Sequence, residues 1–293
     1  MQIIQTIILG LVQGLTEFIP ISSSAHLVIV PWLFGWDDPL FRSLGFDVAL
    51  HLGTLTAVVA FFWKDWVRLV GAWFKSVGRL RIGTHLEVGK DPDRRMAWYI
   101  LAACVPGGVA GVLFEGRIEE LFHPKGSPIL GPSMIAMAVI IAILGGLLLL
   151  ADSLAKHERE LGSMRWRDAL VIGLSQALAI FPGVSRSGAT ITAGLALGFE
   201  RESAARFSFL LSAPIIAGAG AKSLYEFARG LGQAGTESAG LSLIALGFAV
   251  AAASGFFCIK LLLGFLQKHT AKAFVFYRWA LAVLIAIVAL VRV

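Results

Sequence analysis

The stretch GLVQGLTEFIPISSS, residues 10–24, recurs without a gap as GLSQALAIFPGVSRS, residues 173–187. Seven of the fifteen aligned positions are identical, and they include a glutamine, a phenylalanine and two serines. Both copies lie in apolar sequence and contain proline and serine, which break one helix or cap the next. Chance similarity of two Gly/Leu-rich segments is the alternative, but the shared polar residues favour an internal repeat of a broken helix.

The composition of the chain indicates an integral membrane protein. Of the 293 residues, 57% are hydrophobic and 15% are charged, whereas soluble domains carry about 25% charged residues. The net charge of +6 does not indicate nucleic-acid binding, because the basic residues fall in loops beside apolar segments, where they orient a membrane protein or meet anionic lipids. Cys104 and Cys258 lie in apolar runs, so no disulfide framework is expected.

The order of apolar segments predicts an all-α polytopic fold in one membrane domain, residues 1–293. Two apolar segments, 3–35 and 168–200, are broken, and irregular backbone at membrane depth is tolerated only where protein buries it or it lines a wet cavity. We expect these two segments to be re-entrant helical hairpins. Residues 1–12 lack the features of a signal peptide, so the first segment is expected to remain in the mature protein. Six further segments are long enough to be transmembrane helices: 46–63, 98–114, 130–151, 206–228, 240–266 and 273–292.

Loop charges predict the orientation of the spans. Residues 64–95 contain eight Lys and Arg, and residues 156–167 contain four more. Basic loops face the cytoplasm, so we expect Lys75 and Arg165 inside, and Asp37 and Lys125 outside. Three spans separate the two repeat copies, and this odd number makes the second copy enter the membrane from the opposite side. The expected architecture is an inverted-topology repeat with halves 1–151 and 152–293, which places binding sites near the midplane.

The tips of the two hairpins carry the candidate site. Arg186 would be costly in hydrocarbon, which marks it as functional by default, and its planar fork suits phosphate oxygens. Serine hydroxyls and a helix N-terminus supply further donors. Glu17 would repel phosphate unless a divalent cation, Mg²⁺ or Ca²⁺, bridged them, so Glu17 is also the expected metal ligand. The set comprises Gln13, Glu17, Ser22, Ser23, Ser24 and His26 from the first tip and Ser185, Arg186, Ser187 and Thr190 from the second.

Ser23 and His26 are the candidates for the chemical step. If a helix resumes near Ser22, these two residues lie three positions apart on one face. A hydroxyl beside an imidazole is a nucleophile–base arrangement. The pattern therefore predicts either attack by Ser23 with His26 carrying the proton, or direct attack by His26.

Less specific interpretations stay open at this stage. Glu17 and Arg186 could form a structural ion pair, and single serines in membrane helices often bond the preceding turn. His51 and Asp47 lie in the span 46–63. The sequence leaves both undecided between a structural role and a place in the cavity.

Two stretches, QGLTEFIPISSSAH at 13–26 and PGVSRSGAT at 182–190, resemble the motifs of the BacA-type undecaprenyl-diphosphate phosphatases of bacteria. The first resembles that family's (E/Q)xxxE motif with its Ser-rich segment and histidine, and the second its PGxSRSxxT motif. Chain length, motif spacing and the stretch FSFLLSAPIIAG at 207–218 also agree. The resemblance implies hydrolysis of undecaprenyl diphosphate to the monophosphate that carries cell-wall precursors. It also implies bacitracin tolerance, because bacitracin binds the diphosphate.

The resemblance also implies roles for individual residues. Gln13 departs from the pattern of many family members, which have Glu at this position. A neutral amide supplies no negative charge to a metal ion, so this residue weakens the case for a charged metal ligand here. The family is described with an outward-facing site, which implies a site facing the exterior of the bacterial cytoplasmic membrane. The expected catalytic residues are Glu17, Ser23, His26 and Arg186, and the expected substrate-binding residues are Gln13, Ser22, Ser24, Ser185, Ser187 and Thr190.

Two other functions use similar sequence features. A polyprenyl-phosphate flippase would need the same phosphate ligands, and inverted repeats with broken helices are typical of transporters. A second lipid phosphatase superfamily has a PSGH motif that SSAH at 23–26 echoes, but SRSGATITAGL at 185–195 lacks that superfamily's histidine. The expected partners are a polyprenyl diphosphate and membrane lipids, with a second copy of the chain as a candidate and nucleic acid excluded.

Overall fold

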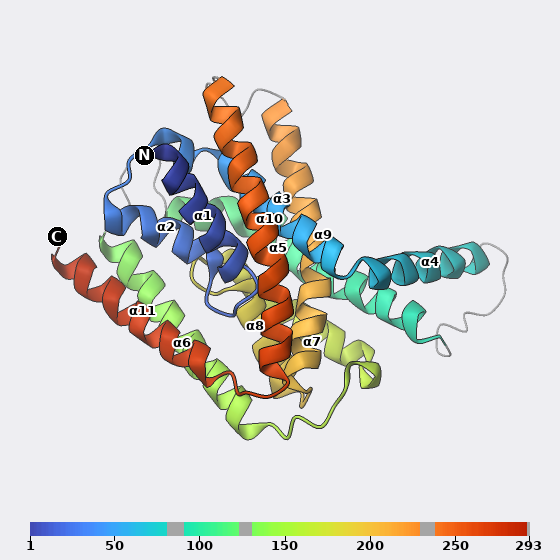
Figure 1. Cartoon of the computed structure of the whole chain (residues 1–293). Coiled ribbons are helices and arrows are strands. Elements are labelled where there is room, and N and C mark those ends of the chain that lie inside the picture. The colour runs from blue at the N-terminus through green and yellow to red at the C-terminus, as the bar shows by residue number, and fades with distance from the viewer. Residues whose placement is uncertain (81–90, 123–130, 229–237, 292–293) are drawn as a thin grey trace.

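The computed structural model describes residues 1–80, 91–122, 131–228 and 238–291, and within these ranges the fold is helical without strands. Figure 1 shows the helices crossing at several angles around a common centre. Short 3₁₀ turns lie at Pro39–Arg42, Leu161–Ser163 and Leu178–Ile180. The α-helices are α1 Gln2–Thr16, α2 Ser23–Phe34, α3 Leu44–Phe61, α4 Trp63–Leu80, α5 Pro92–Phe122, α6 Gly131–Leu154, α7 Trp166–Ala177, α8 Arg186–Ala196, α9 Arg201–Ala228, α10 Ser238–Leu266 and α11 Lys272–Val291.

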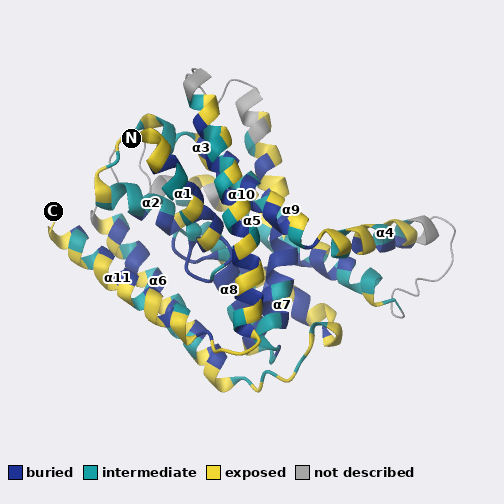
Figure 2. Ribbon diagram, in the orientation of Figure 1, coloured by how far each residue is buried: buried dark blue, intermediate teal, exposed yellow. Residues whose placement is uncertain are grey.

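Six of these helices are long and apolar enough to cross a membrane, namely α3, α5, α6, α9, α10 and α11. They coincide with the six predicted spans and confirm an all-α polytopic fold. Many of their large apolar side chains are exposed, such as Leu261 and Leu290 at 70% and 68%, and Figure 2 marks the exposed residues of α10 and α11 in yellow. This is the pattern of helices whose outer faces meet lipid rather than water.

Helix α5 is longer than the predicted span 98–114. Asp91 caps its start by accepting the backbone N–H of Asp93 at 3.0 Å, and Pro92 fits the first helical position, where no N–H is needed. At the other end the helix continues to Phe122, beyond the end of the predicted span, because Glu, Arg and Leu favour helix. Lys125, predicted to face outward, lies outside the described residues.

The two broken segments are present as predicted, with breaks between α1 and α2 and between α7 and α8. Ser22 has φ 76° and Ser185 has φ 67°, a left-handed conformation that is uncommon outside glycine. Each serine is the N-cap of the helix that follows: the hydroxyl of Ser185 accepts the N–H of Gly188 at 3.0 Å, and that of Ser22 faces the N–H of Ala25 at 3.5 Å. The two repeat copies thus share an unusual backbone, while their passage through the membrane as re-entrant hairpins stays a prediction.

Close packing of α1 and α3 against α10 holds the first break at the centre. A Cβ atom on Gly14 would lie 1.9 Å from the hydroxyl of Ser254, and one on Gly53 would lie 2.5 Å from the carbonyl of Phe248. Small residues at such crossings let membrane helices approach closely. On the other side, α8 packs among α6, α7 and α9, which brings the second break to the same centre.

Candidate active site

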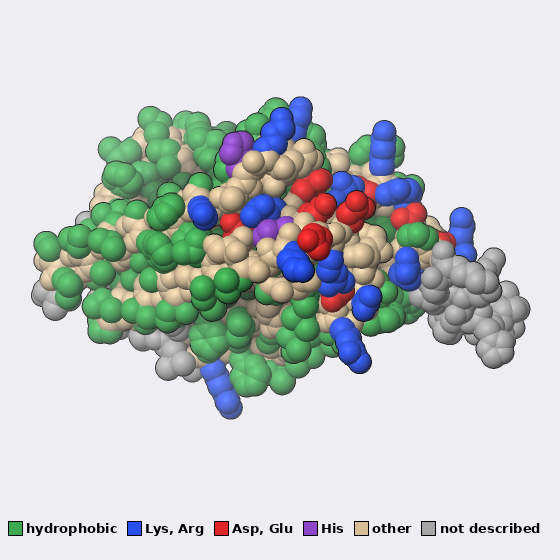
Figure 3. Space-filling view, turned by 90° about the horizontal axis from the view of Figure 1, so that it is seen from below, with side chains coloured by type: hydrophobic (Ala, Val, Ile, Leu, Met, Phe, Trp, Pro, Cys, Tyr) green, Lys and Arg blue, Asp and Glu red, His purple; other side chains and the backbone are tan. Residues whose placement is uncertain are grey.

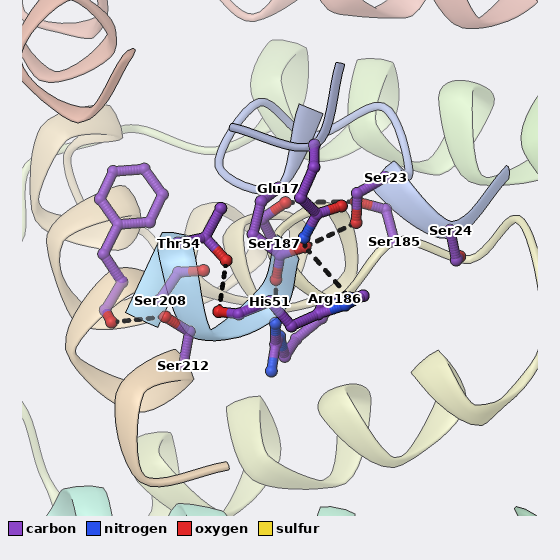
Figure 4. Close-up of polar contacts among 12 residues, drawn as sticks. Glu17, Ser23, Ser24, His51, Thr54, Ser185, Arg186, Ser187, Ser208 and Ser212 are labelled. Carbon is purple, nitrogen blue, oxygen red and sulfur yellow. Dashed lines mark hydrogen bonds and ion pairs between the residues drawn. The ribbon is translucent and has the colours of Figure 1, made fainter. Parts of the chain in front are cut away.

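The two breaks meet through an ion pair between the guanidinium of Arg186 and the carboxylate of Glu17. Arg186 is the first residue of α8, and Glu17 follows the last residue of α1. A second contact joins the same segments, because the Ser187 hydroxyl donates to the backbone carbonyl of Ile19 at 3.2 Å. Figure 4 shows these side chains converging from both segments. The structure therefore brings together residues that lie far apart in sequence.

The carboxylate of Glu17 is the hub of the site. It is 4% exposed, and it accepts hydrogen bonds from Gln13 Nε2 at 3.0 Å and from the Ser23 hydroxyl at 2.6 Å, besides its pairing with Arg186. Burial of a carboxylate is costly unless it is paired and hydrogen-bonded, and here both oxygens have partners. Because the Ser23 hydroxyl donates directly to the Glu17 carboxylate, that carboxylate is positioned to act as a base toward Ser23.

The candidate hydroxyls divide into supporting and accessible groups. Ser22 and Ser185 are buried and cap helices, and Thr190 is buried with its hydroxyl 2.6 Å from that of Ser208. Ser23 is half-buried and Ser24 is exposed, so their hydroxyls can meet a ligand. Two helices, α2 and α8, begin at the site, and the positive dipole end of a helix N-terminus favours a negatively charged group.

His26 does not bond Ser23 in this structure. Its Nδ1 lies 2.6 Å from the carbonyl oxygen of Ser22, and its Nε2 lies 2.7 Å from the hydroxyl of Tyr277. A carbonyl oxygen only accepts, so Nδ1 carries the proton and Nε2 can accept the Tyr277 hydroxyl. The Tyr277 and His26 rings also stack, with centroids 5.6 Å apart. The predicted Ser23–His26 pairing is thus replaced by two separate pairs, Ser23 with Glu17 and His26 with Tyr277.

His51 belongs to this cluster, although the sequence left it undecided. It lies on α3, where its Nδ1 is 2.9 Å from the carbonyl oxygen of Asp47 and its Nε2 is 4.0 Å from Glu17 Oε2. The side chain is 29% exposed, so it borders the open part of the site. An ionisable residue within a span was the signal that could have found it.

Arg278 was missed altogether, and it joins the two breaks from α11. Its side chain is 1% exposed; Nε donates to the carbonyl of Pro20 at 2.5 Å, and Nη2 donates to the carbonyl of Val184 at 3.5 Å. A Cβ atom on Gly188 would lie 2.1 Å from Nη2, so the glycine leaves room for the guanidinium. Nη1 has no hydrogen-bond partner among the described residues. An arginine inside an apolar span was again the overlooked signal.

The residues present suit a divalent cation only in part. Within the described ranges, no three His, Cys, Asp or Glu side chains come close enough to hold a metal ion by themselves. However, Gln13 Oε1 is buried and has no hydrogen-bond partner in the described part of the chain, while Nε2 of the same amide bonds the Glu17 carboxylate. Mg²⁺ is commonly held by one or two carboxylates together with substrate phosphates. Glu17 and Gln13 therefore fit as two protein ligands of a cation whose remaining ligands would include phosphate oxygens of the substrate.

Comparisons with known proteins show which chains this one is similar to over nearly its whole length. The family described as bacitracin resistance protein BacA matches residues 6–284 of the chain. A protein of Thermomicrobium roseum named undecaprenyl-diphosphatase is 45% identical over 288 residues, covering 98% of each chain. Proteins of the same name from Caldicellulosiruptor bescii and Moorella thermoacetica are 44% and 46% identical over 288 residues, again covering 98% of each chain.

Proposed function

The chain belongs to the BacA family of bacitracin resistance proteins, and on that premise we propose that it hydrolyses undecaprenyl diphosphate to undecaprenyl phosphate and inorganic phosphate. This reaction returns the lipid carrier to peptidoglycan synthesis and removes the diphosphate that bacitracin binds. The observation that carries the proposal is the Glu17–Ser23–Arg186 cluster, where a hydroxyl, a base and a guanidinium meet between two helix N-termini.

The substrate is expected to bind with its two chemically different ends in different surroundings. The polyprenyl chain would lie along the apolar outer faces of the spanning helices, because hydrocarbon is their normal surrounding. The diphosphate would lie at the junction of the breaks, where Arg186 is 17% exposed and Ser24 is open to a ligand. Arg186 would exchange part of its pairing with Glu17 for a bidentate grip on phosphate oxygens.

Ser23 is the proposed nucleophile. As its Oγ attacks the terminal phosphorus, the Oγ–H proton passes to Glu17, which accepts that hydrogen bond at 2.6 Å. An Oγ–P bond forms and the phosphoanhydride P–O bond breaks, so undecaprenyl phosphate leaves with the bonding electron pair. Arg186 stabilises the negative charge that develops on the phosphoryl oxygens.

The second half of the reaction restores the serine. Water loses a proton to His26, whose Nε2 can accept one, and attacks the phosphoserine. The P–Oγ bond breaks, inorganic phosphate leaves, and Ser23 Oγ recovers the proton that Glu17 received. His51, with Nε2 4.0 Å from Glu17, is placed to exchange that proton. When bound, a divalent cation would add charge neutralisation for the phosphates, with Glu17 and Gln13 Oε1 as its protein ligands.

The proposed location is the bacterial cytoplasmic membrane, with the site open to the exterior. Figure 3 views the molecule from below and shows Lys and Arg side chains gathered on that face, together with acidic partners. Lys156, Arg165 and Lys268 are exposed in the connections that precede α7 and α11, and basic loops favour the cytoplasmic side. The orientation is therefore supported by the distribution of charge over the molecule.

Phosphate release from undecaprenyl diphosphate by the purified chain in detergent tests the proposal. Wild type and a Ser163→Ala control, altered at an exposed turn, should release one phosphate per substrate, whereas Ser23→Ala should release almost none. The phosphatase proposal would be wrong if folded wild type released no phosphate. If that protein instead moved a labelled polyprenyl phosphate from one leaflet of a vesicle bilayer to the other, the flippase would be the better account.

A further inference from the structure

Helix α4, Trp63–Leu80, carries a surface that the phosphatase mechanism does not use. It directly follows the spanning helix α3 and precedes the spanning helix α5, but its charged residues keep it from being a span itself. Figure 1 shows it standing out from the body of the molecule beside the first part of α5. Because α3 delivers the chain to one side of the membrane and α5 begins its return from that side, α4 lies at that membrane surface.

One face of α4 packs on α5. Leu69, Ala72 and Ser76 are 4%, 7% and 2% exposed, and the Ser76 hydroxyl accepts the indole N–H of Trp98 at 3.0 Å. The spacing of three and four residues places all three on one side of the helix. Trp66 and Trp73 are also partly buried against the core, so the exposed part of α4 is what remains beside these packed residues.

A second face is an exposed apolar strip. Trp63, Val67, Val70 and Phe74 are 56%, 64%, 47% and 63% exposed, and their spacing of four, three and four residues forms one continuous line. A contiguous exposed apolar strip of this kind marks a membrane or protein contact. In water its four large side chains would be unfavourably hydrated.

A third face is basic and lies next to the apolar strip. Lys64, Arg68 and Lys75 are exposed and fall about 100° around the helix from Trp63, Val67 and Phe74, because each basic residue follows one of these apolar residues. Long basic side chains can extend from an apolar surface to the headgroup level of a bilayer. This combination of an apolar face and a cationic face is typical of helices that lie in the plane of a membrane surface.

The start of α4 is fixed in orientation. Arg206 of α9 donates to Asp65 at 2.8 Å, and its guanidinium lies 5.3 Å from the ring centroid of Phe62. Because of these contacts, the apolar and basic strips keep a constant direction relative to the spanning helices.

We propose that α4 is an in-plane membrane anchor whose apolar strip enters the boundary of the acyl chains and whose basic strip binds the phosphates of anionic phospholipids. The occupant is a lipid surface rather than a protein, because the cationic strip complements anionic headgroups and runs parallel to the apolar one. The spanning helices on either side of α4 hold it at such a surface without a further partner.

The depth of each strip can be measured in the full-length chain in nanodiscs containing phosphatidylglycerol. Single cysteines replace Val67 or Lys75 in a background where Cys104 and Cys258 are serine, and each carries an environment-sensitive fluorophore. The label at 67 should be quenched by lipids spin-labelled near the headgroup end of the chain, less by lipids labelled at the chain terminus, and little by aqueous iodide. The label at 75 should be quenched by iodide.

Three outcomes of this labelling would overturn the anchor. Iodide quenching at both positions would place α4 in water. Strongest quenching from the chain terminus would place it deep in the bilayer. Protection at position 67 from both kinds of quencher would show that a protein surface, such as a second copy of the chain, covers the strip.

The basic strip has a separate test with a matched control. The variant K64Q/R68Q/K75Q should bind its first phosphatidylglycerol, as followed by native mass spectrometry, about fivefold more weakly for each charge removed, equivalent to about 1 kcal/mol per charge. The control K156Q/R167Q/K268Q removes three exposed cations elsewhere and should change this affinity much less. Equal weakening in both variants would attribute binding to overall charge and contradict a site on α4.

Discussion

Replacing Glu17 with glutamine distinguishes between two roles for this residue, a catalytic base and a partner in a purely structural ion pair with Arg186. Glutamine keeps the size of the side chain and can still accept one hydrogen bond, but it cannot take the proton of Ser23. It also removes the countercharge of Arg186 and the proposed protein charge on a divalent cation. The variant should therefore lose turnover and need more Mg²⁺ or Ca²⁺ for half-maximal rate.

The contacts in the structure set the size of these losses. A positioned general base contributes about 10²- to 10⁴-fold to rate, which corresponds to about 3–5 kcal/mol in the activation free energy. Removing one partner of a buried pair costs about 3–5 kcal/mol of stability. Arg186 is 17% exposed and can recover some hydration, so we expect a stability loss below about 3 kcal/mol.

Asp168→Asn is the matched control for the loss of a buried charge. Asp168 is 8% exposed and pairs with Arg159 at 2.5 Å, on helix α7 rather than at the junction of the breaks. Phosphate release and thermal unfolding should be measured for both variants in the same detergent. Both should unfold at lower temperature, but only Glu17→Gln should lose turnover. Turnover within about threefold of wild type in Glu17→Gln, well short of the 10²-fold expected of a base, would refute the catalytic role and leave a structural ion pair.

Other substitutions test the remaining parts of the site. Arg186→Lys should lower kcat by about 10²- to 10³-fold, because a point charge cannot replace a bidentate fork; near-normal kcat would make Arg186 structural. His26→Ala should abolish phosphate release while diphosphate binding, measured by calorimetry, stays near wild type, and lost binding would make His26 a ligand. Tyr277→Phe should lower kcat by about tenfold without changing KM, as expected for loss of one hydrogen bond to His26; an unchanged kcat would remove Tyr277 from the mechanism. Gly188→Ala should displace Arg278 and reduce both thermal stability and turnover, and a fully active, stable variant would show that the guanidinium moves freely.

The sequence predicted the spans and the breaks because both depend on local chemistry. Long apolar runs identify spanning helices, and proline with serine marks the point where a helix stops and another begins. The convergence of Glu17 and Arg186 followed from pairing the two repeat copies. The division into inverted halves and the path of the hairpins through the membrane remain predictions of that repeat.

The contacts that the sequence could not supply are non-local. Helical spacing predicted that Ser23 and His26 share a face of one helix, and both lie on α2, but the hydrogen bond of each depends on what packs against α2. Glu17 approaches Ser23 from the break, and Tyr277 approaches His26 from α11, 251 positions along the chain. The sequence did not identify Arg278 as a site residue, although it lies in an apolar run. Its two carbonyl partners belong to the breaks, and only the folded chain brings them to Arg278.

A covalent trapping experiment tests the central claim most directly. The purified chain is mixed with undecaprenyl diphosphate labelled in its terminal phosphate, quenched within milliseconds in acid or in alkali, and digested for mass spectrometry. The account predicts an acid-stable phosphoserine at Ser23 that forms in wild type and is missing from Ser23→Ala, which should also be inactive. An acid-labile, alkali-stable phosphate on His26, or full phosphate release by Ser23→Ala, would contradict it.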